Sequence, residues 1–237
     1  MRALVFDLDG TLVDDRAFAT AARETAEEVA RGLPGVAGDE LAAAFTAALA
    51  ELSAEIGDGL VAGRWNGRSF LAEGWGRALG ACGAHDPVLA RRAVERHWEG
   101  GLVALDLYED AVPCLRWARE RMDHVALVTN GSSDMQWGKL GALGLARWFD
   151  RIVVSGEHGV AKPDPAVFTP ALDGCPIPRT GIWYVGDSLA HDIAGARAAG
   201  IGAIWLNRHG RSLANGDPAP EVEIASLDEL PDAIGDE

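Results

Sequence analysis

The sequence predicts an α/β protein with a doubly wound parallel sheet and an inserted, mostly helical cap. Short apolar runs rich in Val and Ile recur along the second half of the chain, and stretches of helical length separate them. The runs do not alternate with polar residues, which is typical of parallel strands covered on both faces. A long Ala-rich stretch with a helical pattern lies between the first apolar run and the others.

The first apolar run, MRALVF, has a strand pattern from its start and leads directly into Asp7. After it the pattern becomes helical. Leu41, Phe45, Leu49, Leu52 and Ile56 recur at helical spacing, and the apolar residues from Val88 to Trp98 indicate another helix. These patterns indicate a mostly helical insertion after the first strand.

The domain boundaries follow from these changes of pattern. Residues 1–14 and 104–237 are assigned to the α/β core, and residues 15–103 to the helical cap, with a loop-like middle at 57–69. Asp14 and Asp15 follow the first strand closely, and we expect them at the hinge to the cap or at a helix N-terminus.

From Leu105 onward, helices and strands alternate. Asp110 is expected to cap the N-terminus of a helix that has Pro113 in its first turn. Further helices are predicted at 134–146 and at 189–199, and Gly200 is placed to end the second one. Strands are predicted at 124–129, 151–155, 182–186 and 203–207, with an edge strand at 222–225.

The composition limits the possible partners. The formal net charge of the 237-residue chain is −15, and such a surface repels phosphate backbones, so we expect no nucleic-acid partner. No apolar run approaches the roughly 20 residues of a membrane span, and the N-terminus has no signal-peptide pattern. Three widely spaced cysteines fit free thiols in a reducing compartment. We expect a cytoplasmic protein, monomeric or homodimeric, with no membrane partner.

Polar residues follow four of the predicted strands. They are Asp7 and Asp9 after the first strand, Thr129 and Asn130 after the second, Lys162 after the third, and Asp187 and Asp192 after the fourth. The carboxyl ends of parallel strands share one edge of a sheet, and ligands bind in the crevice there. The sequence therefore predicts that these residues converge on one site.

A cluster of carboxylates with one lysine remains strongly anionic, and either raised pKa values or a divalent cation would relieve it. Hard oxygen ligands without His or Cys suit Mg²⁺. Magnesium with carboxylates, a threonine hydroxyl and a lysine is typical of phosphoryl-transfer sites. The ion and Lys162 would also give an acidic protein the local positive charge that a phosphate ligand needs.

Four segments resemble the motifs of the haloacid dehalogenase-like hydrolases. They are FDLDGTLVD, VTNGS, AKPDPAVF and VGDSLAHDIAGARAAG, in the order that the family has them. The resemblance covers residues 1–14 and 104–230 and implies a Rossmann-like core. The insertion after the first strand is similar to the helical C1 cap of subclass I in this family.

The resemblance implies a role for each matching residue in a phosphatase reaction. Asp7 would be the nucleophile that forms an aspartyl-phosphate, and Asp9 the general acid and base. Lys162 would pair with Asp7 and with the transferring phosphoryl group. The other roles are phosphate binding by Thr129, Asn130 and Lys162, and Mg²⁺ binding by Asp7, Asp9 through its carbonyl, Asp187 and Asp192.

Asp9 favours a phosphatase over the dehalogenases of this family, which lack a carboxylate at that position and need no metal. A phosphomutase of the same fold would keep Asp9, and a non-catalytic phosphometabolite-binding protein would need neither a nucleophile nor an acid. The segment from Leu127 to Phe168 also looks like that of pyrimidine 5′-nucleotidases and N-acylneuraminate-9-phosphatases. Nucleoside monophosphates or sugar phosphates are therefore the expected small-molecule substrates.

The cap offers residues that could contact such a substrate. Arg16, Arg64, Trp65 and Arg68 carry charge or a ring that an anionic or ring-bearing molecule could use. The alternative is that the tryptophan packs against cap helices and the arginines are solvated.

Overall fold

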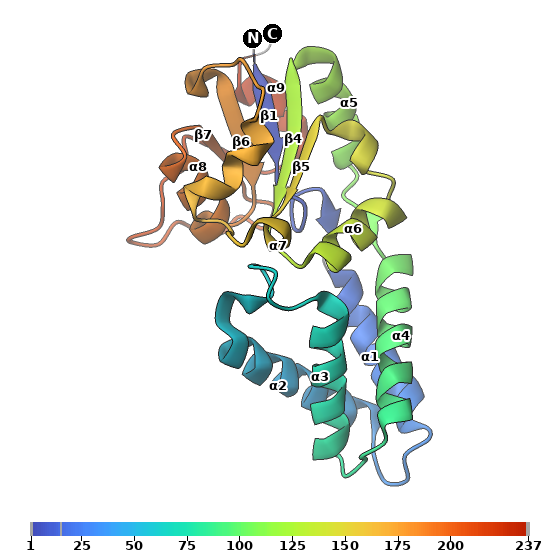
Figure 1. Ribbon diagram of the computed structural model, residues 1–237. Coiled ribbons are helices and arrows are strands. Elements are labelled where there is room, and N and C mark those ends of the chain that lie inside the picture. Colours follow the sequence, from blue (N-terminus) through green and yellow to red (C-terminus); the bar gives the residue numbers. More distant parts are fainter. Residues whose placement is uncertain (1, 15, 236–237) are drawn as a thin grey trace.

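A six-stranded parallel sheet forms the centre of the core in the computed structural model, which describes residues 2–14 and 16–235 (Figure 1). The strand order is β5-β4-β1-β6-β7-β8, and each neighbouring pair is parallel. The strands are β1 (Ala3–Phe6), β4 (His124–Thr129), β5 (Arg151–Val154), β6 (Ile182–Gly186), β7 (Gly202–Leu206) and β8 (Val222–Ile224). This arrangement confirms the predicted sheet, including its edge strand.

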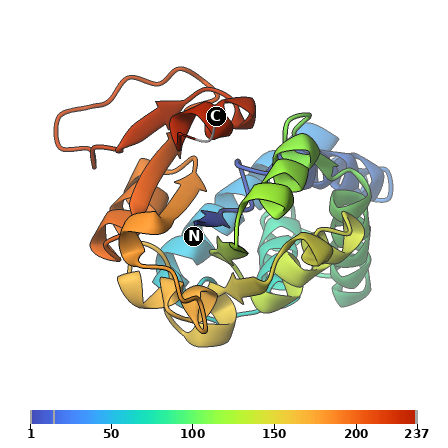
Figure 2. The same ribbon diagram turned by 90° about the horizontal axis from the view of Figure 1, so that it is seen from above.

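Helices cover both faces of this sheet, as the view from above shows (Figure 2). The covering helices include α5 (Ala111–Arg121), α8 (Ala194–Ala198) and α9 (Leu230–Ala233), with a π-helical turn at Leu189–Ile193 just before α8. The helices α6 (Ser133–Ala142) and α7 (Ser155–His158) lie at the carboxyl end of the sheet, next to the cap (Figure 1). Short 3₁₀ turns lie at Gly57–Gly59, Ala146–Trp148, Pro165–Phe168, Pro170–Leu172, Arg179–Gly181 and Leu227–Glu229. Gly200 follows α8 with a φ of +70°, a left-handed conformation that ends the helix as predicted.

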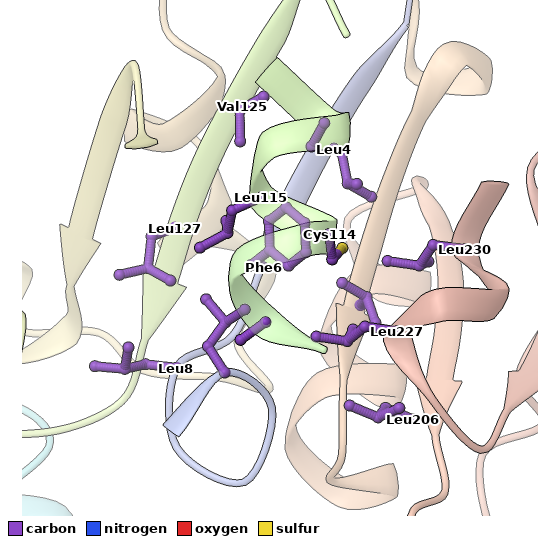
Figure 3. Close-up of a cluster of buried hydrophobic side chains, with 14 of the residues drawn as sticks. Leu4, Phe6, Leu8, Cys114, Leu115, Val125, Leu127, Leu206, Leu227 and Leu230 are labelled. Carbon is purple, nitrogen blue, oxygen red and sulfur yellow. The ribbon is translucent and has the colours of Figure 1, made fainter. Parts of the chain in front are cut away.

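Separate apolar clusters fill the two faces of the sheet. On one face, side chains of β1 and β4 pack against Leu115 of α5, and against Leu227 and Leu230 near the C-terminus (Figure 3). On the other face, Val5 and Tyr184 pack with the segment around Phe168 and with α8. Burial on both faces is why the strands are continuous apolar runs in the sequence.

Four helices form the cap: α1 (Arg16–Ala30), α2 (Gly38–Ile56), α3 (Gly67–Ala81) and α4 (Pro87–Val103). They enclose their own core, in which the rings of Phe45 and Trp75 stack with centroids 4.0 Å apart. The chain enters the cap through β2 (Val13–Asp14) and returns through β3 (Asp106–Leu107), and these two strands pair antiparallel. Asp14 thus lies where the cap begins, and Asp15 lies outside the described residues.

The cap contacts the core through α6 and the loop after β5. The backbone N–H groups of Gly67 and Arg68, at the start of α3, donate to the Asp134 carboxylate of α6. The Ser155 hydroxyl donates to the carbonyl of Val61 in the cap loop at 2.6 Å. These bonds hold the cap against the carboxyl edge of the sheet. None of the helices in the described part of the chain is long and apolar enough to span a bilayer.

Asp110 stands at the N-cap position of α5 as predicted, but its side chain does not cap the helix. Its carboxylate makes no capping bond to α5. Instead it accepts hydrogen bonds from both terminal nitrogens of Arg208, each 2.8 Å long. It also accepts the Ser226 hydroxyl and the Leu227 N–H. Asp110 therefore ties the start of α5 to the C-terminal part of the core, because a charged guanidinium is a stronger hydrogen-bond donor than the backbone at the helix end.

Candidate active site

Residues from four strand ends line one hollow of about 160 Å³ at the carboxyl edge of the sheet. They are Asp7, Asp9, Thr129, Asn130, Lys162, Asp187, Ser188, His191 and Asp192. All seven polar residues that the sequence places after strands are among them. The predicted convergence is therefore observed, and it follows from the parallel order of β4, β1 and β6.

The ammonium of Lys162 lies at the bottom of this hollow and uses all three of its N–H donors. It donates to Asp7 Oδ1 at 2.5 Å, to Asp192 Oδ1 at 2.7 Å and to the Tyr184 hydroxyl at 2.8 Å. The Lys162 side chain is only 3% exposed. A buried ammonium needs such partners, because leaving one charge unpaired in the interior is strongly destabilising.

Asp192 completes this network with both of its oxygens. Oδ1 accepts from Lys162 and lies 2.9 Å from the Tyr184 hydroxyl, and Oδ2 accepts the backbone N–H of Ser188 at 2.8 Å. Gly186 makes this position possible, since a Cβ there would lie 2.4 Å from the Asp192 Cγ. Asp192 therefore orients the Lys162 ammonium. Tyr184 also belongs to this network, and the sequence did not predict it.

Burial raises the pKa of two carboxyl groups in the hollow. For Asp7 burial dominates, and the charges of Asp192 and Asp9 add to it, whereas Lys162 lowers the pKa. Burial and the charge of Asp192 raise the pKa of Asp187 to about 6. Both shifts have one physical origin, because crowded carboxylates in a poorly solvated hollow carry more negative charge than one lysine balances.

Asp9 is held by two residues of α6. Lys139 Nζ donates to Asp9 Oδ1 at 2.7 Å, and Gln136 Nε2 donates to Asp9 Oδ2 at 2.9 Å. The Lys139 side chain is only 8% exposed, whereas that of Asp9 is 26% exposed, so the ammonium is shielded from solvent and the carboxylate still faces the hollow. The sequence analysis assigned neither residue to the site, although their spacing of three places them on one helix face.

Thr129 and Asn130 are positioned by their neighbours. The Thr129 hydroxyl accepts from Gln136 Nε2 at 2.5 Å, which leaves its own proton for a ligand oxygen. Asn130 exchanges two hydrogen bonds with the backbone of Lys162, each 2.9 Å long. The Asn130 side chain therefore ties the two loops together, and its backbone N–H is the group left to meet a phosphate oxygen.

The carboxylates of Asp7, Asp187 and Asp192 each offer an oxygen within 4.8 Å of the others, so they could hold a metal ion. Both Asp192 oxygens accept hydrogen bonds of 2.8 Å or less, whereas Asp7 Oδ2 has only a 3.5 Å contact with the Thr11 hydroxyl. Asp7 and Asp187 are therefore the better direct ligands. Gly10, with a φ of +76°, allows the close approach of Asp187, whose Cγ would lie 2.8 Å from a Cβ at that position. All-oxygen donors fit Mg²⁺. The Asp9 carboxylate is outside this cluster, which leaves its backbone carbonyl as the ligand predicted there.

The structure does not bring the four predicted cap residues to the hollow. Arg16 pairs with Asp14, Arg64 pairs with Asp58, and Arg68 donates to Glu95 at 2.8 Å. The half-buried Trp65 ring lies against Gly59 of its own loop. Nearby carboxylates outside the hollow hold these arginines, and we therefore leave the arginines and Trp65 out of the site.

A family model described as haloacid dehalogenase-like hydrolase matches residues 1–200. The match includes every residue that lines the hollow. The chain is a haloacid dehalogenase-like hydrolase. The resemblance of its four motifs to this family is thereby confirmed.

Curated relatives of this hydrolase include three phosphate-releasing enzymes. The phosphoserine phosphatase of Thermus thermophilus is 38% identical over 124 residues, 52% of this chain and 49% of the relative. The pyrimidine 5′-nucleotidase of Escherichia coli K12 is 40% identical over 107 residues, 45% and 47% of the two chains. The N-acylneuraminate-9-phosphatase of Mus musculus is 30% identical over 135 residues, which are 56% of this chain and 54% of the relative. The chain spans about half the length of these relatives, and both kinds of enzyme that its central segment resembles are among them.

Solved structures with the same fold include enzymes of two chemistries. A 2-haloacid dehalogenase from Pseudomonas syringae superposes with a TM-score of 0.73 at 26% identity, covering 99% of this chain and 98% of that one. A HAD phosphatase from Thermococcus onnurineus has a TM-score of 0.69 at 25% identity, covering 100% and 99%. These likenesses confirm the predicted fold class of this haloacid dehalogenase-like hydrolase, and its chemistry must be argued from the hollow.

Proposed function

We propose that this hydrolase is a Mg²⁺-dependent phosphatase that hydrolyses a small-molecule phosphomonoester through an aspartyl-phosphate at Asp7. One observation carries the proposal: a second carboxylate, Asp9, lines the same hollow as Asp7 and is held there by Lys139 and Gln136. Transfer of a phosphoryl group from an alcohol needs an acid for the leaving oxygen. Displacement of a halide needs none, because halide ions leave without a proton.

In the first half of the reaction, an Asp7 oxygen attacks phosphorus and the bond from phosphorus to the ester oxygen breaks. Asp9, in its protonated form, gives its proton to the departing oxygen, and the alcohol leaves. In the second half, the Asp9 carboxylate accepts a proton from the water molecule that attacks phosphorus. The bond between phosphorus and Asp7 then breaks, and phosphate leaves.

The remaining residues position and neutralise the phosphoryl group. The Lys162 ammonium, fixed by Asp192 and Tyr184, holds Asp7 in place and offsets its charge. The Thr129 hydroxyl and the Asn130 backbone N–H would bind phosphoryl oxygens. Asp7, Asp187 and the Asp9 carbonyl would hold Mg²⁺, which when bound supplies positive charge beside the transferring group.

The relatives support a phosphate ester as substrate, because the three described above are named for the release of phosphate from an amino acid, a nucleotide or a sugar acid. Within this class, the sequence predicts nucleoside monophosphates or sugar phosphates.

Hydrolysis of p-nitrophenyl phosphate tests the proposal. We expect turnover with Mg²⁺, loss of turnover with EDTA, and loss in Asp7→Asn, whose amide cannot act as the nucleophile. Full activity in EDTA or in Asp7→Asn would contradict the mechanism. Release of chloride from 2-chloropropionate in EDTA would instead support a dehalogenase, and a product in which the phosphate reappears on the same molecule would support a phosphomutase.

A further inference from the structure

The cap contains a second, larger cavity of about 400 Å³. Apolar side chains of α1, α2 and α3 form most of its wall, among them Phe18, Phe45, Leu49 and Phe70, and His97 of α4 lies beside them. Cavities of this size are typical of small-molecule sites. Its wall is therefore large and apolar enough to receive a ring or a branched hydrocarbon group.

This cavity adjoins the catalytic hollow through one ion pair. Lys139 of α6 lines the cavity, and its ammonium donates to Asp9 Oδ1, which lines the hollow. Met135, one turn earlier on the same helix, also lines the cavity. Asp9 is the residue that would protonate the leaving oxygen. The carbon skeleton attached to that oxygen would therefore extend past Lys139 into the cavity.

The uncharged polar groups of the cavity wall, on His97 and Thr46, already have partners within the cap. Of its two charged residues, Lys139 pairs with Asp9 and Arg23 is exposed to solvent. His97 Nδ1 accepts from Trp75 Nε1 at 3.2 Å, and His97 Nε2 bonds the Phe18 carbonyl at 2.9 Å. Burial lowers the pKa of His97 to about 4, so the ring is uncharged at neutral pH. The Thr46 hydroxyl donates to the Ala42 carbonyl at 3.0 Å. A hydroxyl-rich ligand would thus lose its bonds to water and find few partners in return.

We propose that this cavity binds the leaving group and selects phosphomonoesters whose alcohol is apolar, ring-bearing and poor in hydroxyls. The inference rests on the proposed phosphatase function and narrows its substrate class. It ranks sugar phosphates, one of the two classes predicted from the sequence, below esters of apolar alcohols. Each buried hydroxyl without a partner lowers affinity by roughly tenfold, so several together give strong discrimination.

Two esters of the same shape test this selection. Cyclohexylmethyl phosphate and glucose 6-phosphate both place a six-membered ring one carbon from the ester oxygen, and they differ mainly in hydroxyls. We expect kcat/KM for cyclohexylmethyl phosphate to be higher by about 100-fold or more, by the same cost per unpaired hydroxyl. Methyl phosphate, which is too short to enter the cavity, measures the chemistry alone.

A pair of variants on α2 locates the effect. Ala42→Leu fills part of the cavity, and it should lower the ratio of kcat/KM for cyclohexylmethyl phosphate to that for methyl phosphate by about tenfold. Ala47→Leu makes the same change on the exposed side of α2, outside the cavity wall, and should leave this ratio within about twofold. Because the ratio is internal to each variant, partial unfolding cancels from it.

The possible outcomes distinguish a failure of this inference from a failure of the proposed phosphatase function. If methyl phosphate is hydrolysed but glucose 6-phosphate is preferred over cyclohexylmethyl phosphate, the inference alone is overturned. The same holds if Ala42→Leu and Ala47→Leu change the ratio of kcat/KM values equally. Failure of all three esters to react with Mg²⁺ would overturn the proposed function and the inference with it.

Discussion

The Lys139 ammonium joins the cap cavity to the catalytic hollow, because it lines the cavity while lying 2.7 Å from Asp9 Oδ1 in the hollow. Gln136, on the same helix, donates to the other carboxylate oxygen of Asp9. Two donors on one helix thus fix the rotation of the carboxylate that would move protons. Asp9 is positioned from α6, and its acid and base steps should depend on that helix.

Lys139→Met should therefore lower kcat by about 100-fold, since positioned acid–base catalysis contributes roughly 10² to 10⁴. Lys139→Arg keeps a cation within reach of Asp9 and should restore part of the loss. Steady-state kinetics with p-nitrophenyl phosphate would separate kcat from KM. An unchanged kcat in Lys139→Met, or a change confined to KM, would show that Lys139 does not position Asp9.

Asp192→Ala should destabilise the core strongly. It removes the partner of Lys162, Tyr184 and the Ser188 N–H at a residue that is 1% exposed. Loss of one member of a buried ion pair costs about 3–5 kcal/mol. Urea unfolding would measure this loss, with exposed Asp173→Ala as a control that should stay within about 0.5 kcal/mol. Similar stabilities of the two variants would argue against this role for Asp192.

Mg²⁺ should stabilise the folded chain through Asp7 and Asp187. At 100 times the dissociation constant, a ligand adds about 2.7 kcal/mol to the free energy of unfolding, which corresponds to a rise in Tm of roughly 5 °C or more for a chain of this size. Asp187→Asn should reduce the rise, and exposed Asp173→Asn should leave it unchanged. A thermal melt detects the binding without any substrate, and an undiminished rise in Asp187→Asn would place the ion elsewhere.

His97 should make the stability of the cap depend on pH. Burial lowers its pKa from 6.5 to about 4, so the unfolded chain binds more protons than the folded chain between these values. The free energy of unfolding therefore falls as the pH decreases through this window, by roughly 2–3 kcal/mol at pH 4.5. His97→Gln cannot titrate and should lose less stability between pH 7 and pH 4.5. Equal losses in both proteins would contradict this account.

The strands of the core were predictable because each is a local run of Val, Ile and Leu that needs burial on both faces. Residues 124–129 and 182–186, for example, form β4 and β6 with the predicted bounds. The convergence of the polar residues after the strands followed from the same parallel order. In both cases the sequence pattern and the tertiary structure depend on the same requirement, the burial of a parallel sheet on both faces.

Other features depended on partners that no local pattern reveals. Asp110 stands at the predicted N-cap position of α5, but its carboxylate bonds Arg208, which is 98 residues away, and not the helix end. A histidine such as His97 is expected at the surface or in a loop, but this one lies buried and accepts a hydrogen bond from Trp75. The cap arginines looked suited to an anionic ligand, yet Arg68 pairs with Glu95 on a neighbouring helix. Lys139 and Gln136 could have been found, since both occur in a segment whose helical spacing was visible.

Detection of the aspartyl-phosphate tests the central proposal most directly. The enzyme is mixed with Mg²⁺ and p-nitrophenyl phosphate, quenched during turnover and reduced with borohydride, which converts an acyl phosphate of aspartate to homoserine. Fragmentation of the peptide that contains residues 3–14 then locates the change. We predict homoserine at position 7, with aspartate retained at position 9. Reduction at another residue, or an unmodified Asp7 in enzyme that is turning over, would contradict the account.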